Sequence, residues 1–201
     1  MAKGRYDIME QTKNIMIVGV GGQGSLLASK LLGRLLCNEG YDVKVSEVHG
    51  MSQRGGSVVT YVRYGDRVDS PIIDKGEADF IVSFEKLEAA RWESCLRPGG
   101  VMVVNSQETD PMPVITGAAE YPHEVLDVMQ KKGIHVDTLD ALTLACQAGT
   151  SKAVNIVLMG RLSTYFTEIP EEKWLAAIEQ IVKPAFVELN KAAFVLGRNT
   201  K

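Results

Sequence analysis

The sequence predicts a three-layer α/β/α fold with a mostly parallel sheet, an antiparallel hairpin within that sheet, and a helical C-terminal region. Two observations lead to this prediction. Short β-rich apolar runs alternate with segments of helical periodicity as far as Asp137, and helical patterns alone follow from Thr138. With 201 residues, of which 45% are hydrophobic, the chain is long enough to bury a core, and we expect one domain over residues 1–201.

The N-terminal part is predicted to form a strand, a helix and a second strand. Residues 14–19 are a short apolar run, which a glycine-rich turn separates from a helix over residues 25–39. Leucines recur in this helix at helical spacing, and Gly40 ends it because glycine readily adopts positive φ. Residues 41–46 form the second strand. Since strand, helix and strand within about 30 residues make a βαβ unit, we expect the two strands to be parallel neighbours.

The following segment interrupts this alternation. A polar, glycine-rich loop covers residues 49–56 and leads into a strand over residues 57–64. After a turn at Gly65, residues 67–74 are expected to return antiparallel, with Pro71 confined to an edge or to a strand end. This pair of strands is the predicted hairpin.

The rest of the chain continues the pattern and then becomes helical. Further strands are predicted at residues 78–84, 101–104 and 134–137. Helices are predicted at residues 85–95, 122–132, 142–147, 152–165, 171–182 and 184–196. Glu85 and Lys86 should be a solvated helix start, and residues 110–113 a loop in which both prolines lack an N–H donor.

Composition excludes several functional classes. Lys plus Arg is 22 and Asp plus Glu is 25, so the net charge of 22 − 25 is −3, and no basic stripe indicates a nucleic-acid partner. No apolar run approaches the roughly 18 residues that a membrane span needs. The N-terminal residues contain no apolar segment of the kind found in secretory signals, so we expect a cytoplasmic protein without a membrane partner.

Three cysteines, Cys37, Cys95 and Cys146, are too far apart for a C-x-x-C pair. The chain therefore supplies neither an iron–sulfur motif nor a structural zinc motif. Cys37 and Cys146 lie among leucine and alanine, and we expect both to be buried, unreactive thiols.

The glycine-rich turn is the first candidate site, and it matches the G-x-G-x-x-G pattern between a strand and a helix. Its members are Gly19, Gly21, Gly22, Gln23, Gly24 and Ser25. Without side chains the backbone can approach a ligand closely, and the N–H groups at the start of a helix favour an anion. The alternative is a turn whose glycines only permit close packing.

A dinucleotide site is a related possibility. Glu47 closes the second strand near the position where an acid would bind a ribose hydroxyl. A dinucleotide domain would continue into another crossover helix, whereas here a polar loop leads into a strand. This difference argues against a plain nicotinamide enzyme.

The polar loop after the second strand is the second candidate site. It offers polar donors and glycines at His49, Ser52, Gln53, Arg54, Gly55 and Gly56. Because both loops should follow the carboxyl ends of neighbouring parallel strands, we expect them to share one crevice. A hydrogen-bonded surface loop or a subunit contact explains the same residues equally well. Glu47 and His49 alone do not make a metal site, and we assign no catalytic residue.

Together these motifs carry a resemblance to a known family. The loops at residues 19–24 and 46–57, with the segments 152–160 and 189–197, resemble the gamma-type subunits of 2-oxoacid:ferredoxin oxidoreductases. Within that family they are most similar to the beta subunit of indolepyruvate ferredoxin oxidoreductase. The resemblance implies a fold like domain III of pyruvate:ferredoxin oxidoreductase.

The resemblance also implies a role as a subunit that is inactive alone. The family's complexes oxidatively decarboxylate 2-oxoacids, including arylpyruvates such as indolepyruvate, to acyl-CoA and reduce ferredoxin. The resemblance implies that thiamine diphosphate, Mg and Fe–S clusters, which carry this chemistry, reside on a large catalytic partner subunit, and the present sequence agrees because it lacks their motifs. The crevice would then face the partner's active site and contact CoA or the 2-oxoacid. Two alternatives stay open: an independent NAD(P)- or flavin-binding oxidoreductase, and a nucleotide-sensing or structural adaptor.

Overall fold

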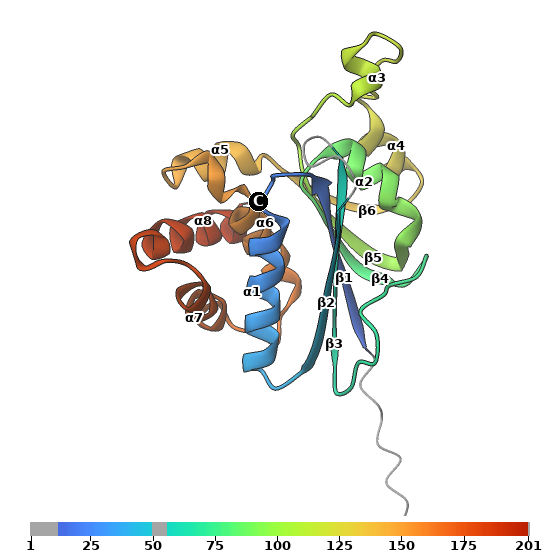
Figure 1. The fold of residues 1–201 in the computed structure, drawn as a ribbon. Coiled ribbons are helices and arrows are strands. Elements are labelled where there is room, and N and C mark those ends of the chain that lie inside the picture. The colour runs from blue at the N-terminus through green and yellow to red at the C-terminus, as the bar shows by residue number, and fades with distance from the viewer. Residues whose placement is uncertain (1–11, 50–55, 201) are drawn as a thin grey trace, which may run out of the picture.

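The computed structural model describes residues 12–49 and 56–200. These residues form a six-stranded mixed sheet in the order β2-β3-β1-β4-β5-β6, with helices on both faces (Figure 1). The strands are β1 Lys13–Val20, β2 Asp42–His49, β3 Ser57–Gly65, β4 Ala78–Ser83, β5 Leu96–Asn105 and β6 His135–Leu139. The helices are α1 Ser25–Asn38, α2 Lys86–Trp92, α3 Met112–Ile115, α4 Val125–Lys131, α5 Ala141–Gln147, α6 Val154–Leu162, α7 Glu171–Ile181 and α8 Val187–Asn199. The predicted α/β architecture is confirmed.

The order of the first three strands corrects the sequence prediction. β1 and β2 run in the same direction but are not neighbours, because β3 lies between them and pairs antiparallel with both. Only residues 50–56 connect β2 to β3. That connection is too short for a parallel crossover, which needs about a dozen residues or more, so β3 must return beside β2 as a hairpin. β1, β4, β5 and β6 are parallel.

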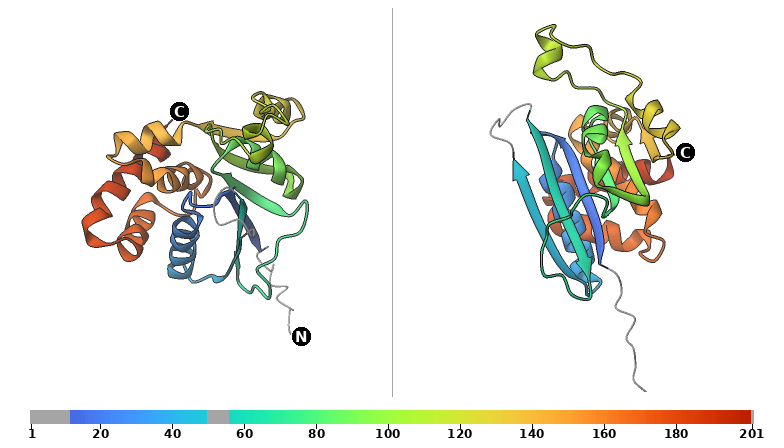
Figure 2. Two further views of the ribbon diagram at one scale, coloured as in Figure 1. Left: turned by 45° about the horizontal axis from the view of Figure 1, so that its top comes forward. Right: turned by 90° about the vertical axis from the view of Figure 1, so that its right-hand side faces the viewer.

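The predicted strand over residues 67–74 is also wrong. Both edges of β3 are already occupied by β1 and β2, so no edge is left for a returning strand. The segment instead crosses the sheet as a loop held by side chains (Figure 2). Asp42 accepts a hydrogen bond from the N–H of Val68, and Arg63 donates to the carbonyls of Ser70 and Ile72.

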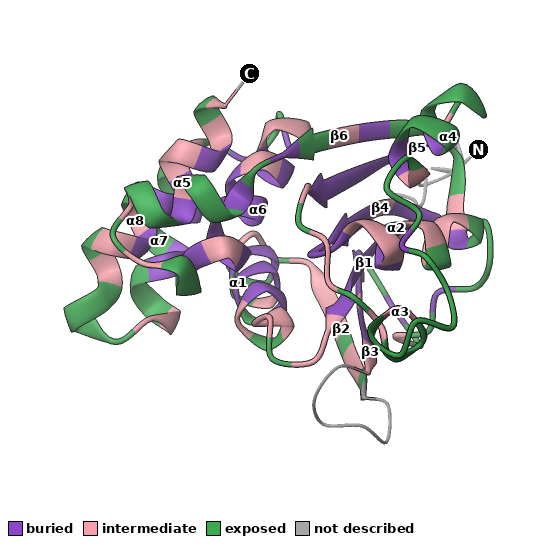
Figure 3. Cartoon of the chain, turned by 90° about the horizontal axis from the view of Figure 1, so that it is seen from above, coloured by how far each residue is buried: buried purple, intermediate pink, exposed green. Residues whose placement is uncertain are grey.

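Alternation along β1 creates a core on each face of the sheet. Ile15 and Ile17 point toward α1, α6, α7 and α8, whereas Met16 and Val18 point toward α2 and α4. Figure 3 shows the buried residues gathered along the strands and on the inner sides of the helices. Since α1 follows β1 onto one face and α2 follows β4 onto the other, the chain changes face between two neighbouring parallel strands.

The C-terminal helices are joined by a very close crossing of α6 and α8. A Cβ added at Gly160 would lie 2.1 Å from the carbonyl oxygen of Phe194, and one added at Gly197 would lie 2.0 Å from that of Val157. Only glycine fits at these two positions. The crossing places α6 in the interior, where seven of its nine residues are buried.

Three side chains differ from expectation in their exposure. Cys37 and Cys146 are exposed, because each lies on the outward side of a helix whose apolar neighbours point inward. Glu85 is only 1% exposed, because its carboxylate caps α2 and accepts hydrogen bonds from the N–H groups of Glu88 and Thr109. Cys95 is buried, and burial raises the pKa of its thiol.

Within the described part of the chain, no helix is both long enough and apolar enough to cross a membrane.

Candidate functional site

The glycine loop between β1 and α1 is held in shape by its own residues. Gly22 and Gly24 have φ of 95° and 90°, which favours glycine at both positions. The side-chain oxygen of Gln23 accepts a hydrogen bond from the N–H of Val20 at 2.7 Å. Gly19 leaves room for this bond, since a Cβ there would lie 2.6 Å from the same oxygen. The loop is therefore rigid and exposes backbone rather than side chains.

A buried asparagine ties the loop to the C-terminal layer. Asn155, at the start of α6, donates from Nδ2 to the carbonyl of Gly24 at 3.1 Å. A Cβ on Gly24 would lie 2.6 Å from that nitrogen, so the two segments approach each other more closely than a residue with a side chain would allow. Residues far apart in the sequence thus share one wall of a site.

A cavity of about 490 Å³ opens beside this loop. Its lining comes from the loop, from the ends of β4 and β5, and from the starts of α5 and α6. The lining residues are Gly22, Gln23, Gly24, Phe84, Gln107, Leu142, Ser151, Lys152 and Val154. It lies outside the carboxyl ends of β1 and β4, the neighbouring parallel strands between which the chain changes face. Open α/β sheets bind their ligands at such switch points.

The charges around the cavity favour an anion. In the part of the chain that the structure describes, no side chain caps the N-terminus of α1, and the N–H groups of Ser25 and Leu26 have no acceptor, whereas the N–H of Leu27 donates to the carbonyl of Gly24. Lys152 is exposed at the rim and forms no ion pair with any described carboxylate. Phe84, Leu142 and Val154 supply apolar surface beside it. The cavity can therefore receive a molecule that has both an anionic and an apolar part.

The remaining predicted residues lie on the other side of the glycine loop, toward β3. The N–H of Gly21 donates to the carbonyl of Gly56 at 3.0 Å, and the hydroxyl of Ser25 donates to Glu47 at 3.1 Å. The backbone of His49 ends β2 opposite Val58. The structure thus brings the two ends of the second loop close to the first loop. The two loops meet because β3 pairs with both β1 and β2, and not because β1 and β2 pair directly.

Part of the second predicted loop lies outside the described residues. This part comprises Ser52, Gln53, Arg54, Gly55 and the side chain of His49. Neither Glu47 nor Gly56 lines the cavity, whose opposite wall comes from α5 and α6.

Sequence reasoning missed several polar residues of the cavity lining. Gln107, Ser151 and Lys152 line the cavity but were not singled out as site residues. One signal was present: Gly149 and Thr150 precede Ser151 and Lys152 at a predicted helix start, a second place where a glycine turn opens a helix. Nothing local indicated that this helix faces the first glycine loop.

A second polar group lies under the start of β3. Glu88 is buried and accepts hydrogen bonds from the hydroxyl of Ser57 and from Arg91. Glu85 accepts a hydrogen bond from the hydroxyl of Tyr121. Burial, followed by the bond to Glu85, raises the pKa of Tyr121, so its hydroxyl stays protonated. These contacts fix Ser57, and with it the carbonyl of Gly56 that holds the glycine loop.

The described residues contain no group of three or more His, Cys, Asp or Glu side chains arranged to hold a metal ion. They also lack a nucleophile paired with a buried base at the cavity rim. The chemistry that this arrangement supports is binding and orientation of an anionic ligand.

Comparisons with known proteins place this chain among oxidoreductase subunits. Residues 14–200 match the family model described as pyruvate ferredoxin/flavodoxin oxidoreductase. The chain is 44% identical over 191 residues to indolepyruvate oxidoreductase subunit IorB of Thermococcus kodakarensis, covering 92% of this chain and 93% of that protein. It is 42% identical over 189 residues to the subunit of the same name from Pyrococcus horikoshii, with the same coverage.

Solved structures show the same fold. Pyruvate oxidoreductase subunit PORC of Thermotoga maritima superposes with a TM-score of 0.71 at 21% identity, covering 94% of this chain and 96% of that one. The family match spans nearly all of the described residues, and the predicted resemblance is confirmed. The chain belongs to the pyruvate ferredoxin/flavodoxin oxidoreductase family.

Proposed function

We propose that this protein is the subunit without redox cofactors in a complex that oxidatively decarboxylates 2-oxoacids to acyl-CoA and reduces ferredoxin. Thiamine diphosphate, Mg and Fe–S clusters are assigned to a large partner subunit. The family match and relatives named as indolepyruvate oxidoreductase subunits support this assignment, and they favour arylpyruvates such as indolepyruvate as substrates. Thiamine diphosphate supplies the carbanion stabilisation that decarboxylation requires, so the present chain contributes binding and orientation.

The cavity beside the glycine loop is proposed to hold the phosphate-bearing part of CoA against the partner's active site. CoA combines several anionic phosphate groups with an apolar arm, the combination that the cavity lining fits. The N–H groups at the start of α1 and the ammonium of Lys152 would meet a phosphate, while Phe84 and Leu142 would pack against the arm. The observation that carries this proposal is a lysine without an ion pair and a helix start without a side-chain cap, both as judged among the described residues, on the lining of one cavity at the switch point.

Steady-state kinetics of the reconstituted complex test the assignment. Lys152→Ala should raise the KM for CoA about tenfold or more, because a hydrogen-bonded charge contact is worth about 1.5–3 kcal/mol, and should leave the KM for the 2-oxoacid unchanged. Lys131→Ala, on the distant helix α4, is the matched control. An unchanged KM for CoA in the Lys152 variant would remove the ligand role from this cavity.

A further inference from the structure

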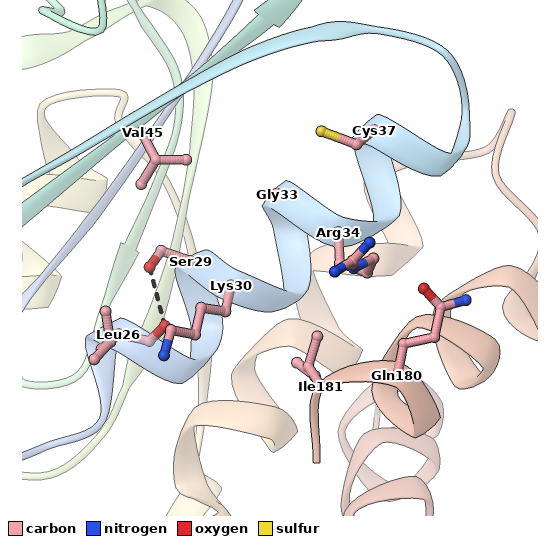
Figure 4. Close-up of a pocket in the computed structure, with 9 residues that line it drawn as sticks. All are labelled: Leu26, Ser29, Lys30, Gly33, Arg34, Cys37, Val45, Gln180 and Ile181. Atoms are coloured by element: carbon pink, nitrogen blue, oxygen red, sulfur yellow. Dashed lines mark hydrogen bonds between the residues drawn. The ribbon is translucent and has the colours of Figure 1, made fainter.

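A larger cavity lies away from the candidate site, along the outer side of α1. This cavity of about 630 Å³, here named the α1 groove, has α1 as its floor and β2 and the end of α7 as its rims (Figure 4). Its lining residues are Leu26, Ser29, Lys30, Gly33, Arg34, Cys37, Val45, Gln180 and Ile181. The floor follows one helical stripe from Leu26 to Cys37, which at 1.5 Å per residue is roughly 16 Å long.

Among the described residues, no contact requires glycine at position 33, in the middle of the floor. Glycine in a helix interior is unfavourable, and here the backbone does not need it. A Cβ at this position would meet only the side chain of Val45, at an ordinary contact distance of 3.8 Å. The missing side chain therefore lowers helix stability and allows no closer packing against any part of the chain that the structure describes. Without a side chain at position 33, another molecule can approach the backbone of α1 closely.

The groove combines exposed apolar side chains with unpaired positive charge. Leu26 is 50% exposed and Val45 is 46% exposed, and Ile181 forms part of the opposite rim. Lys30 and Arg34 flank Gly33, and neither forms an ion pair with a carboxylate among the described residues. β2 also lies at the edge of the sheet, since in the described part of the chain it pairs with β3 alone.

We propose that the α1 groove is the docking surface for the catalytic partner subunit. The occupant is a segment of that subunit whose apolar side chains fill the groove over Gly33 and whose carboxylates meet Lys30 and Arg34. Complementary charge around an apolar centre is the usual anatomy of a specific protein interface. This proposal rests on the proposed function, because that function supplies the identity of the partner subunit.

The shape of the groove favours a polypeptide over a small ligand. Small-molecule sites enclose most of their ligand, whereas this groove runs open along three turns of α1 between two separate rims (Figure 4). The candidate CoA cavity is lined by the loop before α1 and by the starts of α5 and α6, so the two surfaces share no lining residue. Substitutions in the groove therefore leave the lining of the CoA cavity unchanged.

Cys37 provides a direct test in the unmodified protein, because its exposed thiol lines the groove. The free chain and the purified complex are alkylated with iodoacetamide, and the rate at each cysteine is followed by peptide mass spectrometry. We expect the complex to slow alkylation of Cys37 about tenfold or more, since an interface core excludes solvent. Cys95, which is buried, should react slowly in both samples. Equal Cys37 rates in free chain and complex would overturn the proposal.

Charge reversal tests the chemistry of the occupant. Lys30→Glu with Arg34→Glu should weaken association with the partner about tenfold or more, because like charges would then face one another. Gly33→Gln should weaken it as well by filling the floor. Lys131→Glu with Arg67→Glu, which changes the net charge equally at exposed positions outside the groove, is the control. Groove and control variants with the same affinity would refute the proposal.

The outcomes separate this inference from the function on which it rests. If the wild-type chain fails to bind any thiamine-dependent partner, the proposed function itself fails. If it binds and Cys37 keeps its free reactivity, only the docking surface is wrong. If Cys37 becomes protected in the isolated chain as its concentration rises, the occupant is a second copy, and the partner assignment is overturned.

Discussion

Among single residues, Gly24 connects the N-terminal strand–helix turn to the C-terminal helical layer at the candidate site. Its backbone has φ of 90°, and its carbonyl receives the hydrogen bond from Asn155. An alanine there would bring two penalties, the left-handed backbone and a contact 2.6 Å from the amide nitrogen of Asn155.

We therefore expect Gly24→Ala to lower the free energy of unfolding by more than the roughly 1–2 kcal/mol that the left-handed backbone alone costs. Urea denaturation measures the loss. Gly117→Ala is the matched control, since Gly117 also has positive φ but a Cβ there would meet nothing within 4 Å. Equal losses in the two variants would show that Asn155 yields freely and that its contact does not constrain the loop.

Some residues of the candidate site could be predicted from the sequence and others could not. The glycine loop was predictable because its signal is local: a strand, closely spaced glycines and a helix follow one another directly. Lys152 was not, because only the packing of α6 against the loop brings it to the cavity. The exposure of Cys37 was mispredicted because residue neighbours in a helix face different sides.

At the scale of elements, Asp140 caps α5 beside the cavity. Its carboxylate accepts hydrogen bonds from the N–H of Thr143 at 3.0 Å and from its hydroxyl at 2.7 Å. These two bonds, that from the backbone first, lower the pKa of Asp140 below its ordinary value of 3.8. The ionised carboxylate is a stronger acceptor than the protonated one, so the extra stabilisation that its charge gives the cap is complete above about pH 3.8 and is lost as the pH falls through the lowered pKa.

Asp140→Ala should therefore lower the free energy of unfolding by about 1 kcal/mol at neutral pH. The difference from wild type should shrink as the pH falls below 3.8. Chemical denaturation at a series of pH values checks this. Asp140→Asn retains a capping oxygen without the titrating charge, so its stability should lack this acid-dependent component. A loss in the alanine variant that is constant across the acid range would contradict the linkage.

Most helices and strands could be predicted from the sequence, whereas the order of the strands in the sheet could be predicted only in part. Periodicity indicated β1, α1, β4 and the C-terminal helices because each buries one face or lies in the interior. The place of β3 was missed, although the short connection over residues 50–56 already excluded a parallel crossover. The extra strand predicted at residues 67–74 assumed a free edge of β3, and only the assembled sheet shows that none exists.

At the scale of the whole molecule, the crossing of α6 and α8 holds the C-terminal layer against the sheet. α6 carries Asn155 to the glycine loop, so the geometry of the cavity depends on how α8 supports α6. Gly160 and Gly197 make that support possible, since each faces the backbone of the other helix.

Gly160→Ala and Gly197→Ala should each destabilise the protein by about 1–3 kcal/mol or more, the usual cost of overpacking, because rigid backbone must move. Thermal unfolding of the purified chain measures this. Gly33→Ala is the control: it is also a helical glycine but has room for a Cβ, so it should instead stabilise the chain by about 1 kcal/mol. If all three substitutions raised the melting temperature, the close crossing would not exist in solution.

The position of β3 between β1 and β2 has a consequence for biosynthesis. Both strands that pair with β1 lie later in the sequence than α1 and β2. While the ribosome is still adding residues before Ser57, the newly made β1 has no partner strand, and the apolar residues 15–18 have no sheet to join. The apolar strand β1 therefore stays unpaired in the nascent polypeptide until β3 has emerged from the exit tunnel, and unpaired apolar segments of this kind are prone to aggregate.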